Sequence, residues 1–71
     1  MVEVFKTNVS SHAEASMLIS EIHRIFTDHI ANFDLEDCDR ILRVQFPQET
    51  NEVSPLMELI RDFGFHAEIL T

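Results

Sequence analysis

The stretch from Val9 to Glu14 holds the residues whose types and spacing are best suited to chemistry. Ser11 precedes Glu14 by three positions, which is the pattern of a helix-capping box. In such a box the Ser11 hydroxyl accepts from the Glu14 N–H, and the Glu14 carboxylate reaches back to the Ser11 N–H. With the imidazole of His12 between them, the same residues can also belong to a ligand-binding loop. The stretch is therefore either a helix start alone or a binding loop.

Two elements must position this stretch. Alternating apolar residues predict a strand over Val2–Val9, and apolar residues at helical spacing predict a helix from His12 to about Phe26. Alternation resumes in a hairpin, Ala31–Phe46, whose polar turn is 36–40. A second helix should start with Ser54 as its N-cap and Pro55 in its first turn, and should close at Gly64. Its buried stripe should comprise Leu56, Leu59, Ile60 and Phe63, and a last strand should follow over Phe65–Leu70.

The order β-α-β-β-α-β predicts one α+β domain over residues 1–71, with the ferredoxin-like arrangement. We expect a four-stranded antiparallel sheet of order 4-1-3-2 with both helices on one face. Val2–Val9 and Ile41–Phe46 are predicted to be adjacent central strands that run parallel. The other face should lie open to solvent. The residues expected on it are Val2, Val4, Lys6, Ile41, Arg43, His66 and Glu68.

Composition restricts the partners. Five basic and thirteen acidic residues give a formal charge of −8, which disfavours nucleic acid and anionic membranes and suits a cationic protein partner or a metal cation. Cys38 is the single cysteine, so an internal disulfide is impossible and a reducing compartment is favoured. There is no apolar run of spanning length and no secretory-type N-terminus, so we expect a cytoplasmic protein.

The chain resembles the heavy-metal-associated domains of copper chaperones and metal-transporting ATPases. That family places Met-x-Cys-x-x-Cys between the first strand and first helix, where this chain has Val9, Ser11 and Glu14 at the Met and two Cys positions. Ile60–Phe65 resembles the family's Ile-x-x-x-Gly-Phe signature after the second helix. The resemblance implies the same fold, but both metal-binding cysteines are absent.

The family holds its metals through two thiolates, which Ser11 and Glu14 cannot replace for a soft ion. A borderline divalent ion such as Zn(II), Ni(II) or Cu(II) can be held by imidazoles and a carboxylate. The resemblance places His12 and Glu14 in the metal loop and brings the segment before Phe65 close to it. His12 and Glu14 are therefore the candidate metal ligands, while ordinary helix-start residues are the alternative. No other cofactor is expected.

Other polar groups have simpler interpretations. Cys38 should lie in the hairpin turn at the end of the fold opposite the first loop, as a small residue or a redox-active thiol. His23 and His29 should be surface or boundary residues. The acidic residues Asp34, Glu36, Asp37 and Asp39 lack the spacing of a calcium loop and should form a solvated hairpin.

No catalytic motif is visible, so we expect no enzyme. Two function classes remain open at this point. One is a non-enzymatic protein-interaction or structural module, which uses the open sheet face or an edge strand to bind an unidentified protein. A basic partner is compatible with the acidic charge of the chain. The other is a metal-binding protein with altered ligands.

Overall fold

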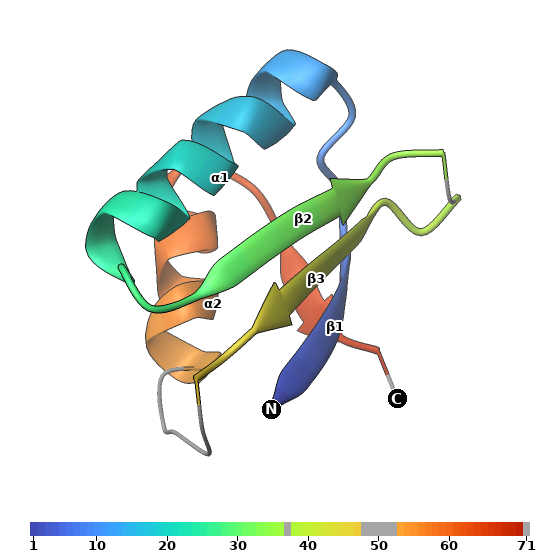
Figure 1. Cartoon of the computed structure of the whole chain (residues 1–71). Coiled ribbons are helices and arrows are strands. Elements are labelled where there is room, and N and C mark those ends of the chain that lie inside the picture. Colours follow the sequence, from blue (N-terminus) through green and yellow to red (C-terminus); the bar gives the residue numbers. More distant parts are fainter. Residues whose placement is uncertain (37, 48–52, 71) are drawn as a thin grey trace.

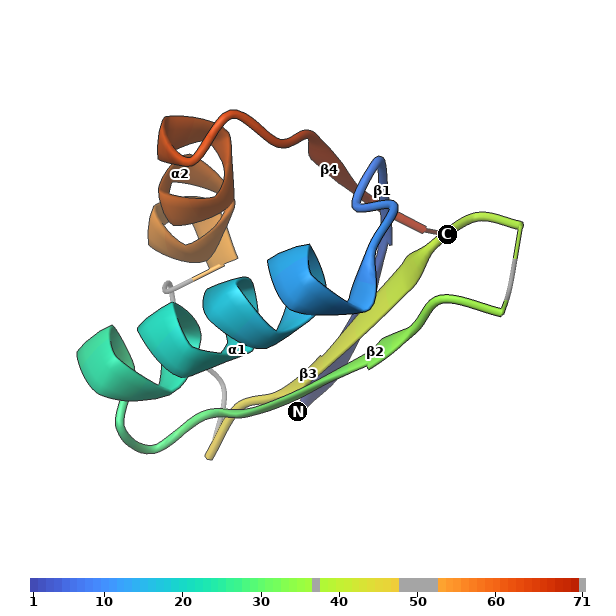
Figure 2. The ribbon, with the colours of Figure 1, turned by 90° about the horizontal axis from the view of Figure 1, so that it is seen from above.

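The computed structural model describes residues 1–36, 38–47 and 53–70 and shows the predicted α+β order (Figure 1). The elements are β1 (Val2–Thr7), α1 (His12–Ile25), β2 (Ile30–Asp34), β3 (Ile41–Gln45), α2 (Val53–Asp62) and β4 (Ala67–Ile69). Both helices lie on the same side of the sheet, which gives two layers (Figure 2). Among the described residues, no helix is long and apolar enough to cross a membrane.

The strands form one four-stranded sheet of order β2-β3-β1-β4, which confirms the predicted order. All three pairings are antiparallel, and Phe5 of β1 lies opposite Leu42 of β3. The prediction that these two central strands run parallel is therefore wrong. The reason is topological: α1 returns the chain so that β2 runs parallel to β1, and the tight hairpin then reverses β3.

This direction of β3 also corrects the position of Cys38. The hairpin lies at the same end of the sheet as the loop after β1, because the Thr7 N–H donates to the Asp39 carbonyl over 3.1 Å. The segment between α2 and β4 lies there too, since the Asn8 N–H donates to the His66 carbonyl over 3.3 Å (Figure 1). Three loops far apart in the sequence thus meet at one end, and the exposed thiol of Cys38 belongs to that end.

The core lies between the sheet and the helices. Alternate residues of β1 and β3 bury their side chains under the helices, as Phe5, Leu42 and Val44 do. A smaller cluster of Val9, Ala15 and Leu18 lies under the start of α1. In α2 the fully buried residues are Leu56 and Ile60, whereas Leu59 is half-buried and Phe63 is 41% exposed. The predicted stripe on α2 is therefore narrower than expected.

Several element ends differ from the predicted ones. β1 ends at Thr7 instead of Val9. The Thr7 Oγ1 accepts a hydrogen bond from the Val9 N–H over 3.3 Å, so this N–H does not pair with a neighbouring strand. α2 begins at Val53, so Ser54 lies inside its first turn and is not its N-cap. Within the predicted polar loop and hairpin turn, residues 48–52 and Asp37 lie outside the described residues.

The end of α2 follows the prediction. Gly64 has φ +88°, the left-handed region that glycine enters without steric cost. Its N–H donates to the Arg61 carbonyl over 2.8 Å, and the Phe65 N–H donates to the Ile60 carbonyl over 3.2 Å. These two bonds form a Schellman motif, which ends the helix and directs the chain into β4.

Candidate functional site

The predicted capping box is present at the start of α1, with one change. The Ser11 Oγ accepts from the Glu14 N–H over 3.1 Å, as predicted. The nearest hydrogen bonds of the Glu14 carboxylate come from Ser10, whose N–H and hydroxyl both donate to Oε1, over 3.3 and 3.2 Å. The carboxylate therefore reaches one residue further back than a standard capping box, because the Ser10 hydroxyl adds a second donor there.

These hydrogen bonds favour the ionised form of Glu14. The backbone N–H of Ser10 is the largest cause that lowers the pKa of Glu14 below its usual value, partial desolvation opposes it, and the hydroxyls of Ser10 and Ser11 lower the pKa further. A negative charge in the first turn also suits the positive end of the helix. Glu14 thus has a sufficient structural role in stabilising the start of α1.

The two candidate metal ligands are placed differently. Glu14 is held by Ser10, whereas His12 is exposed and lies beside a groove of about 310 Å³ between α1 and β2. Across the described ranges, no three His, Cys, Asp or Glu side chains are grouped so that they can hold a metal ion. Since Ser11 and Glu14 are both engaged in the cap and neither carries a thiol, the first loop does not fit a soft metal such as Cu(I).

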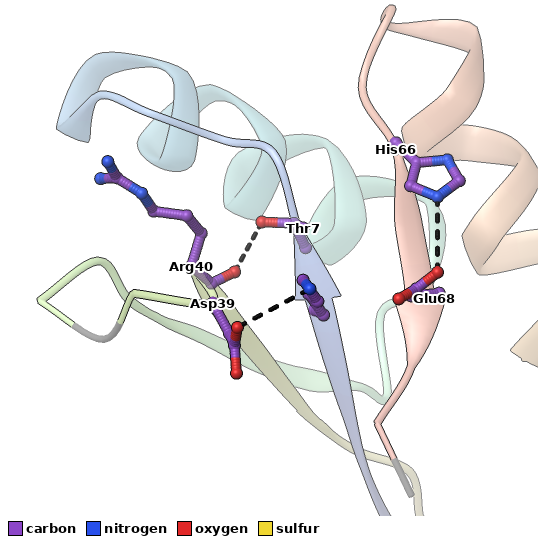
Figure 3. A network of polar contacts seen from close by, with 6 residues as sticks. Thr7, Asp39, Arg40, His66 and Glu68 are labelled. Carbon is purple, nitrogen blue, oxygen red and sulfur yellow. Dashed lines mark hydrogen bonds and ion pairs between the residues drawn. The ribbon is translucent and has the colours of Figure 1, made fainter.

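A second histidine at this end of the molecule, His66, directly precedes β4. Its Nε2 is 3.7 Å from the Glu68 carboxylate (Figure 3). Its backbone N–H donates to the Asn8 Oδ1 over 2.7 Å. The side chain is largely exposed and also borders the groove between α2 and β4. His66 thus contacts its own strand and the first loop through Asn8.

A polar bridge that the sequence did not reveal joins β1 to the hairpin. The Thr7 hydroxyl donates to the Arg40 carbonyl over 2.6 Å (Figure 3). Arg40 has φ 51°, a left-handed conformation that is costly for a residue with a Cβ. Nearby, Lys6 Nζ lies 3.8 Å from an Asp39 carboxylate oxygen. A buried threonine at the end of a strand was the available signal, but threonine is also an ordinary strand residue.

The histidines at the end of α1 are both used structurally. His23 is exposed, and its Nε2 accepts from the Ala31 N–H over 3.1 Å. His29 is only 4% exposed, and its ring stacks on Phe26 and meets Phe46 edge-on, at centroid distances of 5.0 and 4.6 Å. The interpretation of His29 as a surface or boundary residue is therefore wrong, because its imidazole packs against these two phenyl rings and is buried with them.

The two outer strands, β2 and β4, present the sheet's edges. On β4 the even-numbered residues bond to β1, since the Leu70 N–H donates to the Val4 carbonyl over 2.8 Å and the His66 carbonyl accepts from Asn8. Ala67 and Ile69 must then direct their backbone N–H and C=O groups outward. Within the described part of the chain, these groups form no hydrogen bond.

A groove of about 200 Å³ lies beside this edge, between α2 and β4. It is lined by Met57, Glu58, Arg61, Phe65, His66 and Ala67. Ile69 continues the same face of β4, since it pairs with the buried Phe5, yet it is 41% exposed. The side of β4 that faces the helices is thus incompletely covered by α2. The sequence alternation placed Ala67 and Ile69 on one face but could not show that α2 leaves them accessible.

Comparison with known proteins identifies no relative: no family model, curated protein or solved structure matches this chain.

Proposed function

We propose that this domain is a non-enzymatic protein-interaction module that binds an extended segment of its partner along β4, so that the segment becomes a fifth strand of the sheet. The observation that carries the proposal is the outward direction of the backbone groups of Ala67 and Ile69, next to the α2–β4 groove. Main-chain hydrogen bonds supply affinity in this binding mode, and pockets for alternate side chains supply specificity.

The opposite edge is less suited to the same task. On β2 the residues whose backbone N–H and C=O groups point outward are Ala31 and Phe33. The Ala31 N–H is already bonded to the side chain of His23. A partner strand on β2 would have to displace that bond. Side chains that occupy an edge in this way are one means by which proteins prevent unwanted strand pairing.

Exposed apolar side chains at β4 favour the same conclusion. Ile69 and Leu70 are 41% and 43% exposed, and they lie on opposite faces of the strand. Fully burying such a side chain contributes about 1.5–3 kcal/mol. A partner strand beside β4 would cover part of both, so backbone pairing and apolar burial would act together.

The proposal includes a cytoplasmic setting, because the one cysteine, Cys38, is an exposed thiol that a reducing compartment would preserve. It also keeps the heavy-metal-associated resemblance as a relation of fold and not of metal chemistry. The altered-ligand metal site at His12 and Glu14 is the alternative, and it requires the Glu14 carboxylate to leave Ser10.

A selection of random peptides displayed on phage tests the proposal. Peptides selected on the domain should shift and protect from exchange the amides of Ala67 and Ile69 in NMR spectra. Ile69→Pro should abolish their binding, because the proline removes an outward N–H and leaves the β1 ladder intact. Ile69→Val keeps that N–H and is the matched control.

Selected peptides that instead shift β2 or the open face around Val4 and Arg43 would contradict the proposed binding edge. Unchanged binding to a folded Ile69→Pro variant would contradict the strand-pairing mode.

A further inference from the structure

We infer that the segment bound at β4 alternates apolar and basic residues. Its apolar side chains enter the α2–β4 groove, and its Lys or Arg side chains lie on the open sheet face. This inference rests on the proposed function, since it names the chemistry of the partner for the same edge.

The alternation follows from the register of β4. Ala67 and Ile69 lie on the side that faces the helices, and Glu68 and Leu70 lie on the open side. A strand paired with β4 alternates in the same way, so every second side chain would point toward the groove. There it would meet Met57, Phe65 and Ala67, which are all half-buried and apolar.

The charge of the other side chains follows from Glu68. It lies on the open face with its side chain 59% exposed, and Lys6 is its register partner on the inner side. Lys6 lies 3.8 Å from Asp39, and the imidazole of His66 lies 3.7 Å from the Glu68 carboxylate, so among the described residues Glu68 forms no ion pair with a Lys or Arg side chain. A partner side chain on the outer side of Glu68 would lie at cross-strand contact distance, where an opposite charge is stabilising and a like charge is destabilising.

The net charge of the chain acts in the same direction. A formal charge of −8 attracts a cationic segment over long range and speeds its association. The same charge disfavours a second copy of this chain as the occupant. In the antiparallel register that would pair Ala67 with Ile69 of the second copy, the two Glu68 carboxylates would also lie directly opposite each other.

Two synthetic peptides test the inference, namely acetylated and amidated Val-Lys-Val-Lys-Val-Lys-Val and the same peptide with Glu at every Lys. Each is titrated into the full chain at low salt while the backbone amides are followed by NMR. The Lys peptide should bind about tenfold more tightly than the Glu peptide, and this ratio should fall toward one in 1 M salt. Shifts should centre on Ala67–Ile69 and on Met57 and Arg61.

Two variants separate the contributions. Glu68→Gln should reduce the preference for the Lys peptide severalfold and leave shifts at β4. Asp28→Asn, at an exposed position in the turn between α1 and β2 and away from the groove, is the matched control for loss of one negative charge. A Lys peptide N-methylated at every second residue should lose binding, because it cannot donate to the edge, and this readout leaves the protein unaltered.

Each outcome decides one of the two proposals. Equal binding of the two peptides at β4 overturns the inference about charge and leaves the proposed function standing. Absence of shifts at β4 with both peptides at millimolar concentration overturns the proposed function itself. Concentration-dependent dimerisation through β4, seen by sedimentation, would replace the basic segment by a second copy.

Discussion

Thr7→Val is the substitution that most directly tests the polar bridge between β1 and the hairpin. Valine has nearly the shape of threonine and suits a strand, so the substitution removes the hydroxyl with little change in packing. The hydroxyl donates to the Arg40 carbonyl over 2.6 Å and accepts from the Val9 N–H over 3.3 Å. Thr7 is 7% exposed and Val9 is fully buried, so water cannot readily replace either bond.

The expected loss of stability can be estimated from these two bonds. A buried polar group left without its partner costs about 1–3 kcal/mol. The Val9 N–H is the more buried of the two and should account for most of it. The methyl group of valine returns at most about 0.8 kcal/mol of apolar burial. The net loss should be about 2 kcal/mol, which lowers the melting temperature of a domain of this size by roughly 8–16 °C.

Thermal and urea unfolding of the wild type, Thr7→Val and Thr7→Ser measure this loss. Serine keeps the hydroxyl and loses only a methyl group, so it should cost less, about 0.5–1.5 kcal/mol. An NMR shift at Arg40 should accompany Thr7→Val, because its left-handed backbone loses a tether. A Thr7→Val protein as stable as the wild type would refute the reasoning, since it would mean that the hydroxyl contributes nothing to stability at this position.

Four further predictions concern the end of the sheet where the loops meet. Ser11→Ala should lower the free energy of unfolding by about 0.5–2 kcal/mol in urea denaturation, since it removes the acceptor for the Glu14 N–H; an unchanged midpoint would mean that α1 does not depend on this cap. The folded state lowers the pKa of Glu14, so the contribution of its carboxylate to stability is present above the unfolded pKa and is lost as the pH falls through the folded pKa. Glu14→Gln should therefore be less stable than the wild type at pH 7 and equally stable at acidic pH. A difference in stability that persists at acidic pH would contradict this. Arg40→Gly should raise the melting temperature, because glycine relieves about 1 kcal/mol of left-handed strain, whereas Arg40→Ala should not. If the alternative metal function holds, Zn(II) should shift the amides around His12 and Glu14 and His12→Ala should abolish those shifts; no shift before a large excess of Zn(II) would leave these residues as a helix start.

The sequence by itself determined the element order and most of the core. Alternation in β1 and β3 placed Phe5, Leu42 and Val44 on one face, because strand side chains alternate whatever the strand's neighbours are. The cap at Ser11 and the helix end at Gly64 were equally readable. Both are local motifs, in which the atoms that interact lie within about one turn of each other in the chain.

The direction of β3 relative to β1, and with it the position of Cys38, was predicted wrongly, although the expected crossover helix and hairpin together imply an antiparallel pair. Alternation says which face a side chain occupies, but it carries no information on strand direction. The burial of His29 against Phe26 and Phe46 and the bond from Ala31 to His23 depend in the same way on how α1 returns to β2.

The candidate binding edge was predicted only in part from the sequence. The sequence predicted a last strand with Ala67 and Ile69 on one face and His66 and Glu68 on the other. The structure has the same alternation. The sequence could not show how far α2 covers the strand, because coverage depends on the packing of Leu56 and Ile60 against residues distant in the chain. Caps and turns depend on residues that are neighbours in the sequence, whereas the exposure of an edge strand depends on how all the elements pack together.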